Sequence, residues 1–178
     1  DLSRRDFTIN AMAQDENNNI IDPLNGQIDL QNQIFKHASG AFSEDPLRAI
    51  RLARFFTYDH LKDFSIDNST IDKVNQIVSS NEISKLSSER VWIETSRALC
   101  SSNPSNYFEK IISLNLIEPF FENLKIAHCH SHSDTEIRWS ELQINNHFKL
   151  GNTMPIPNEF KNASNVLKNI SKITNTVS

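Results

Sequence analysis

Cysteine is scarce in this chain, and long hydrophobic runs are missing from it. Cys100 and Cys129 are the only two cysteines in 178 residues. Because they stand far apart and in no paired spacing, they offer no disulfide framework and favour a reducing compartment. No run reaches the roughly 20 apolar residues that a membrane-spanning helix needs, and the opening DLSRRDFTIN resembles neither a signal nor a transit peptide. We therefore expect a cytoplasmic protein without a membrane partner.

An excess of positive charge is also missing. The 18 lysines and arginines are outnumbered by 22 aspartates and glutamates, which gives a net charge of −4 and a pI of about 5.9. A nucleic-acid partner would therefore have to bind to a local basic patch, because the net charge of the whole chain would repel it. With 38% hydrophobic residues, the chain is long enough to bury one or two modest cores.

Helical spacing dominates the pattern of apolar residues. Two short strands are expected at Ile20–Ile21 and Ile34–Lys36, beside Asp-Pro and Asn-Gly turn signals. The expected helices span residues 1–14, 43–58, 69–79, 88–100, 104–114, 117–125 and 158–173. The stretch 126–157 is polar and turn-rich, and we expect it to be irregular. The sequence thus predicts a mainly α fold with one small β element near the N-terminus.

The segment EDPLRAIRLAR, residues 44–54, places acids and three arginines on one expected helix that Ser43 would cap. Asp45 and Arg48 are three residues apart, so their side chains would lie side by side on one helix face. An acceptor beside a fork of donors matches the Watson–Crick edges of cytosine and adenine. Uracil and guanine reverse this pattern and would leave buried polar groups unpaired. The pair therefore predicts a site that selects C and A.

Two further arginines continue this row along the expected helix. Arg51 and Arg54 would suit phosphate groups or a nucleic-acid backbone. The alternative is a set of intrahelical salt bridges on a solvated face. Leu52 and Phe55 project into the same sector as Arg48 and Arg51, however, which predicts a mixed and partly buried surface.

A second polar group stands in the first ten residues. Asp6 and Asn10 are four apart and would share a helix face, where they could bind a ribose hydroxyl, while Arg4 and Arg5 could contact phosphate. The alternative is a charged first turn followed by a polar surface residue. Taken alone, the RRD string does not separate the two interpretations.

Taken together, RRDFTINAMA, IIDPLNGQIDL and FSEDPLRAIRLARF resemble, in this order and spacing, the class II CCA-adding enzymes, which are bacterial tRNA nucleotidyltransferases, and their poly(A) polymerase relatives. LSSERVWIETSRAL and NYFEKIISLNLIEPFFENL resemble the family's neck and body helices, so the likeness covers roughly residues 1–125. DPLNGQIDLQNQ and HASGAFSEDPLR look more like a CCA-adding enzyme than a poly(A) polymerase.

The resemblance implies a role for each matching residue. The RRD motif implies that Arg5 binds the incoming nucleotide and that Asp6 lies near its ribose. Asp45 and Arg48 match the protein template that selects C and then A in this family. The remaining arginines of the row, Arg51 and Arg54, match arginines that the family uses in nucleotide binding.

The resemblance also implies tRNA as partner, CTP and ATP as substrates and Mg²⁺ as cofactor. In this family the metal-binding carboxylates lie on strands of a head domain, N-terminal to the RRD motif. Asp1 and Asp6 do not stand in a strand-borne Asp-x-Asp arrangement. We therefore expect a chain that lacks most of the catalytic head, has no catalytic or metal-binding residues of its own and cannot add nucleotides alone.

Potential metal ligands nevertheless gather in HCHSHSD, namely His128, Cys129, His130, His132 and Asp134. Histidines two apart alternate sides in a strand and do not share a helix face, although an irregular loop could bring them together. A solvated polar loop is the alternative that we favour. The metal-dependent phosphohydrolase string found in some family members does not occur in this sequence.

These observations predict a CCA tRNA nucleotidyltransferase that transfers CMP and AMP to tRNA 3′ ends. Residues 1–40 would be the end of the head domain, 41–80 the neck with the nucleotide-selecting helix, and 81–178 the helical body. Two alternatives stay open: a bacterial poly(A) polymerase, which would use ATP alone, and a non-catalytic remnant that binds nucleotide or tRNA.

Overall fold

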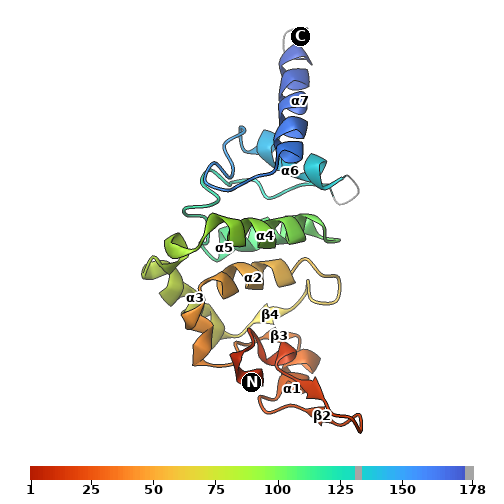
Figure 1. The fold of residues 1–178 in the computed structure, drawn as a ribbon, viewed down its shortest axis with the longest axis vertical. Helices are drawn as coiled ribbons and strands as arrows, with labels where there is room; N and C mark the ends of the chain where they lie inside the picture. The colour runs from red at the N-terminus through yellow and green to blue at the C-terminus, as the bar shows by residue number, and fades with distance from the viewer. Residues whose placement is uncertain (131–133, 175–178) are drawn as a thin grey trace.

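Helices dominate the architecture, and they are stacked along one long axis (Figure 1). The structure is a computed structural model, and it describes residues 1–130 and 134–174. The N-terminal segment and the strands lie at one end, α6 and α7 lie at the other, and α2, α4 and α5 fill the middle (Figure 1). The described residues confirm the mainly α fold.

The α-helices are α1 (Gly26–Gln31), α2 (Leu47–Phe55), α3 (Asn68–Ser79), α4 (Ser88–Leu99), α5 (Pro104–Ser113), α6 (Thr135–Asn145) and α7 (Asn158–Thr174). Short 3-10 helices span Leu2–Arg4, Thr8–Asn10, Gly40–Glu44 and Glu82–Lys85. The strands β1 (Ala13–Gln14) and β2 (Ile20–Ile21) pair antiparallel, and β3 (Ile34–Phe35) and β4 (Ser65–Ile66) pair parallel. The described residues therefore contain two small sheets where the sequence predicted one β element.

Four predicted helices form where their local signals placed them. The bounds of α3, α4, α5 and α7 agree with the prediction to within one residue. Asp67 and Ser87 cap α3 and α4 by accepting hydrogen bonds from backbone N–H groups. Pro104 occupies the first turn of α5, where its missing N–H costs nothing.

The predicted helix over residues 1–14 is wrong. Phe7 forms a β-bridge with His37, and the Thr8 backbone N–H donates to the Lys36 carbonyl at 2.9 Å. Phe7 is fully buried against the rings of Phe35, Phe42 and Phe55. Burial of this ring between distant segments outweighs the weak local preference for helix.

Four other features differ from the prediction. The helix expected from Ser43 begins at Leu47, and residues 40–44 form a 3-10 turn capped by Ser39. Residues 117–125 form turns around a cis Glu118–Pro119 peptide. The stretch expected to be irregular contains α6, and α1 was not expected.

The scarce cysteines are both free thiols, one exposed and one buried. Burial raises the pKa of Cys129 to about 11, so this thiol stays protonated and unreactive at neutral pH. None of the helices in the described ranges is long and apolar enough to cross a membrane.

Gly26 is a position that tolerates no side chain. A Cβ there would lie 2.2 Å from the Thr8 carbonyl oxygen. Thr8 follows Asp6 and Phe7 in the segment that pairs with Lys36 and His37, directly after β3, so a shift at this point would spread through the first ten residues. We expect Gly26→Ala to lower the free energy of unfolding by about 1–3 kcal/mol in urea titration, the usual cost of overpacking.

Gly40 provides the matched control, because a Cβ at that glycine meets no atom within 4 Å. Gly40→Ala should therefore leave the midpoint of the urea transition nearly unchanged. Equal effects at the two glycines would show that the contact between α1 and the Thr8 backbone does not restrain the N-terminal segment.

Candidate functional site

Asp6 joins the N-terminal segment to α2. Its carboxylate receives Arg51 Nε at 2.8 Å and Arg51 Nη2 at 2.7 Å on one oxygen, and lies 3.2 Å from Arg48 Nε on the other. The Asp6 side chain is only 12% exposed. The structure thus brings Asp6 together with two arginines that lie 42 and 45 positions later in the sequence.

The backbone on both sides of Asp6 is fixed by β3 and its extension. The Asp6 carbonyl accepts from the Ala38 N–H at 3.1 Å, and Phe7 is held by its bridge to His37. The carboxylate is therefore presented to α2 by a short ordered segment. Asp6 and Asn10 do not share a helix face as predicted, since Asn10 Oδ1 accepts from the Phe7 N–H at 3.0 Å.

Three oxygen atoms hold the guanidinium of Arg48 in place. Besides Asp6, its Nη1 donates to the Ala41 carbonyl at 2.6 Å and its Nη2 to the Arg4 carbonyl at 2.7 Å. A guanidinium has five N–H donors in a rigid plane. The two carbonyls take one N–H from each terminal nitrogen, and Nε faces Asp6 in an ion pair. The second N–H of each terminal nitrogen can therefore still be directed toward a ligand.

Asp45 lies before α2 and not on it. Its backbone is extended, with φ −128° and ψ 97°, and its carboxylate accepts from the Leu47 N–H at 3.3 Å. Its other oxygen receives Arg90 of α4 at 2.8 Å. Asp45 and Arg48 therefore do not pair on one helix face as predicted. Asp45 contacts Arg90, and Arg48 contacts Asp6.

Glu94 of α4 is the buried counterpart of Asp6. Its side chain is 3% exposed and accepts from Arg54 Nε at 2.5 Å, Arg97 Nη1 at 3.2 Å and Arg51 Nη1 at 3.4 Å. Arg54 also donates to the hydroxyl of Tyr58. Carboxylate and arginines thus satisfy one another inside the protein and clamp α2 to α4.

The arginine row divides by depth along α2. Arg54 is 7% exposed and reaches Glu94 and Tyr58, so its guanidinium is directed inward. Arg48 and Arg51 are 14% and 29% exposed and share Asp6. The partly buried, mixed surface expected from the sequence is confirmed.

Electrostatics at this site favour an anion. Burial by itself would lower the pKa of Arg51, but the charge and hydrogen bond of Asp6 and the charge of Glu94 raise it above its ordinary value. The site's arginines outnumber its carboxylates by five to three, Arg48, Arg51, Arg54, Arg90 and Arg97 against Asp6, Asp45 and Glu94, which leaves an excess of two positive charges. Arg5 is exposed beside this site in the N-terminal segment, which adds to the attraction for phosphate.

The described residues do not fit a catalytic metal. Both oxygens of Asp6 are bound by arginines. In the described ranges, no group of three histidine, cysteine or acidic side chains is arranged to hold a metal ion. His130 binds Glu141 at 2.9 Å through Nδ1, and His132 lies outside the described residues.

Two members of the site were missed from the sequence. Glu94 shares the face of α4 that carries the buried Val91, Thr95 and Ala98. An acid at a core position of an amphipathic helix signals a buried partner, although the pattern cannot name that partner. Arg90 gives no such signal, because an arginine one turn into a helix is ordinary.

Two family models match the chain. "Poly A polymerase head domain" matches residues 1–36, and "Probable RNA and SrmB- binding site of polymerase A" matches residues 63–127. Among curated proteins, the "Multifunctional CCA protein" of Pseudoalteromonas atlantica is 48% identical over 124 residues, which is 70% of this chain and 31% of that protein. The "CCA-adding enzyme" of Buchnera aphidicola is 43% identical over 128 residues, 72% of this chain and 30% of that protein.

Solved structures agree with these matches. The Bacillus stearothermophilus CCA-adding enzyme in complex with CTP has a TM-score of 0.79 at 23% identity, over 97% of this chain and 47% of that one. A tRNA nucleotidyltransferase complexed with a primer tRNA and an incoming ATP analog has a TM-score of 0.63 at 25% identity, over 79% of this chain and 40% of that one. The chain spans about a third of the length of the curated relatives that it matches. By these sequence and fold matches, the chain belongs to the family of CCA-adding enzymes and poly(A) polymerases.

Proposed function

We propose that this chain selects nucleotides for a CCA-adding tRNA nucleotidyltransferase, with CTP and ATP as substrates and tRNA as partner. The observation that carries the proposal is the fixed Arg48 guanidinium, held by Asp6 and two backbone carbonyls, with Asp45 three residues before it. The names of the curated relatives support the same activity.

In this proposal Arg48 and Asp45 read the base. The two uncommitted N–H groups of Arg48 donate to the ring-nitrogen acceptor of C or A, and the Asp45 carboxylate accepts from the exocyclic amine. Asp45 would have to exchange its contact with Arg90 for the base. That contact is half-exposed and therefore weak, so the exchange requires little free energy.

In this proposal the neighbouring residues bind the sugar and the phosphates of the nucleotide. Asp6 and Asn10 lie on the ribose side, and Arg5 and Arg51 meet the phosphates. Arg54 is a positioning residue in this proposal. It is buried against Glu94 and holds α2, the helix from which Arg51 projects. Residues 1–40, 41–80 and 81–178 then serve as head segment, neck and body.

Mg²⁺ is the cofactor of the proposed reaction. The only acid of the site that faces the arginines from the N-terminal segment, Asp6, is fully engaged by them. The residues described hold and orient the nucleotide. We also infer that this work takes place in the cytoplasm, where the buried thiol of Cys129 stays reduced.

A poly(A) polymerase is the second candidate, because both matching family models carry that enzyme's name. It would add adenylate alone and accept varied RNA ends. Selection of C by the same site separates the two functions.

The test is nucleotide incorporation onto a tRNA without its CCA end, with Mg²⁺, CTP and ATP. This chain would be assayed alone and then joined to the head domain of the Bacillus stearothermophilus relative. We expect C, C and A to be added only by the joined protein. Adenylate tails from ATP alone would favour the poly(A) polymerase, and a folded but inactive joined protein would contradict both candidates.

A further inference from the structure

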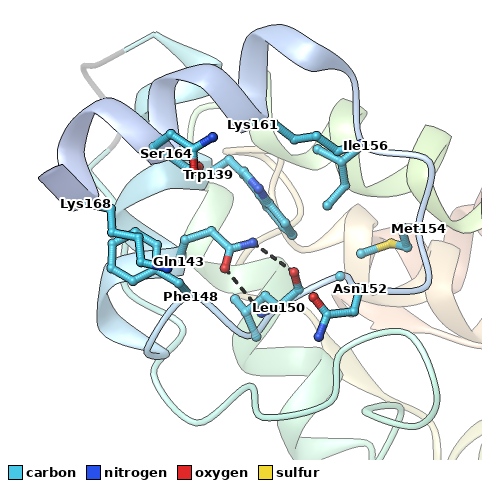
Figure 2. A pocket seen from close by; sticks show the side chains of 12 residues that line it. Trp139, Gln143, Phe148, Leu150, Asn152, Met154, Ile156, Lys161, Ser164 and Lys168 are labelled. Atoms are coloured by element: carbon cyan, nitrogen blue, oxygen red, sulfur yellow. Dashed lines mark hydrogen bonds between the residues drawn. The ribbon is translucent and has the colours of Figure 1, made fainter.

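A pocket between α6 and α7 has no part in the proposed nucleotide site (Figure 2). These two helices lie at the far end of the molecule from the N-terminal segment (Figure 1). The pocket has a volume of about 380 Å³ and lies between α6, α7 and the loop that joins them. Its lining residues fall between 139 and 168, outside both segments that the family models match. The pocket is therefore a feature that the family match does not explain.

The floor of the pocket is apolar and fixed. Trp139, Leu150, Met154 and Ile156 line it and are at least nine-tenths buried. Gly151, with φ +70°, lets the loop close here, since a Cβ would lie 2.9 Å from Ile156 Cδ1 and 3.2 Å from the Trp139 indole.

Gln143 ties the loop to α6. Its Nε2 donates to the Leu150 carbonyl at 2.8 Å, and its Oε1 accepts from the Leu150 N–H at 3.2 Å (Figure 2). The amide nitrogen and the amide oxygen of the buried Gln143 side chain are both hydrogen-bonded to the loop. The pocket therefore has a defined shape before any ligand enters.

The rim of the pocket is cationic and rich in amides. Lys161 and Lys168 line the pocket from α7, and the amide side chains of Asn152 and Asn165 also line it. Lys168 Nζ lies 4.9 Å from the centre of the Phe148 ring, which forms an aromatic wall. No aspartate or glutamate is among the twelve lining residues. Although the whole chain has a net charge of −4, two lysines and no acidic side chain line this pocket. The lining therefore favours an anion, and the Phe148 wall favours one with an aromatic part.

We propose that this pocket binds one nucleotide unit, with its base against Phe148 and the apolar floor and its phosphate on Lys161 and Lys168. The volume lies within the 300–1,000 Å³ range of small-molecule sites. The amides of Asn152 and Asn165 provide both donors and acceptors for a base edge. Stacking on aromatic side chains beside a basic rim is the usual way in which proteins hold an unpaired base.

The same chemistry is offered by a free nucleotide and by an unstacked nucleotide of single-stranded RNA. The test is an amide NMR titration of the full 178-residue chain, first with AMP and then with a six-residue oligoadenylate. We expect saturable shifts at Gly151, at Asn152 and at the Trp139 indole N–H. An affinity for the oligomer at least ten times that for AMP identifies RNA as the source, and equal affinities identify the free nucleotide.

The diagnostic variant reverses both charges on the rim, Lys161→Glu with Lys168→Glu. We expect at least a tenfold loss of affinity, because two phosphate contacts become repulsive. Lys149→Glu is the matched control, since Lys149 is an exposed lysine at the same end of the chain and does not line this pocket. It should change the affinity by less than a factor of two.

The proposal is overturned if neither ligand produces saturable shifts around Gly151. It is also overturned if the double variant binds as tightly as the original chain, or if the shifts are confined to α2 and α4. A separate titration with CTP, followed at Arg51 and Glu94, reports on the proposed function. Failure of one site is therefore distinguishable from failure of the other.

Discussion

Replacing Glu94 with alanine is expected to lower the free energy of unfolding by about 3–5 kcal/mol, the usual cost of removing one partner of a buried ion pair. Arg54 would keep its charge inside the protein after losing its carboxylate partner, with the Tyr58 hydroxyl and the rings of Phe55 and Tyr58 as its remaining side-chain contacts. The measurement is urea unfolding at 25 °C, followed by far-ultraviolet circular dichroism.

Two further variants test whether the loss of stability comes from the unpaired charge of Arg54 or from a general weakening of α4. Arg97→Ala removes another partner of Glu94, but Arg97 is 58% exposed, so we expect a change of less than about 0.5 kcal/mol. Glu94→Leu combined with Arg54→Met should recover most of the loss, because an apolar pair of similar volume replaces two desolvated charges. A double variant as unstable as Glu94→Ala would show that packing and not charge dominates this contact.

The second large effect is expected on base selection. Asp45→Ala or Arg48→Ala should reduce the preference for CTP and ATP over UTP and GTP by roughly 10- to 100-fold. This range corresponds to the 1–3 kcal/mol that an unpaired buried polar group costs, a penalty that only the wrong base incurs in the unaltered site. The measurement is the ratio of incorporation efficiencies for the four nucleotides in the joined protein.

Controls for this experiment follow from the contacts of Arg48. Arg48→Lys keeps the charge but loses the planar fork, so it should lose selection nearly as fully as alanine while binding the triphosphate better. Arg90→Ala frees Asp45 without touching Arg48 and should preserve selection. Unchanged discrimination among the four nucleotides in Asp45→Ala and Arg48→Ala would refute the base-reading role.

Part of the site could be predicted from the sequence because it depends on short-range spacing. Arg48, Arg51 and Arg54 are three apart, so α2 places them in a row whatever else surrounds them. The partial burial of that row also followed from Leu52 and Phe55 in the same sector. The depth of each arginine did not follow, because it depends on which acid approaches from another element.

The sequence by itself determined the helices whose caps and apolar periodicity agree, such as α3, α4 and α5, and the family to which its motifs belong. Only the tertiary structure decided that residues 1–14 form two 3-10 turns, a bridge from Phe7 to His37 and strand β1 instead of one helix, and that α6 forms within a polar stretch. It also decided that Asp6 and Glu94, 40 or more residues from the arginines of α2, anchor this helix from two sides. Caps and periodicity act within one or two turns, whereas a buried charge takes its partner from whatever element packing brings near it.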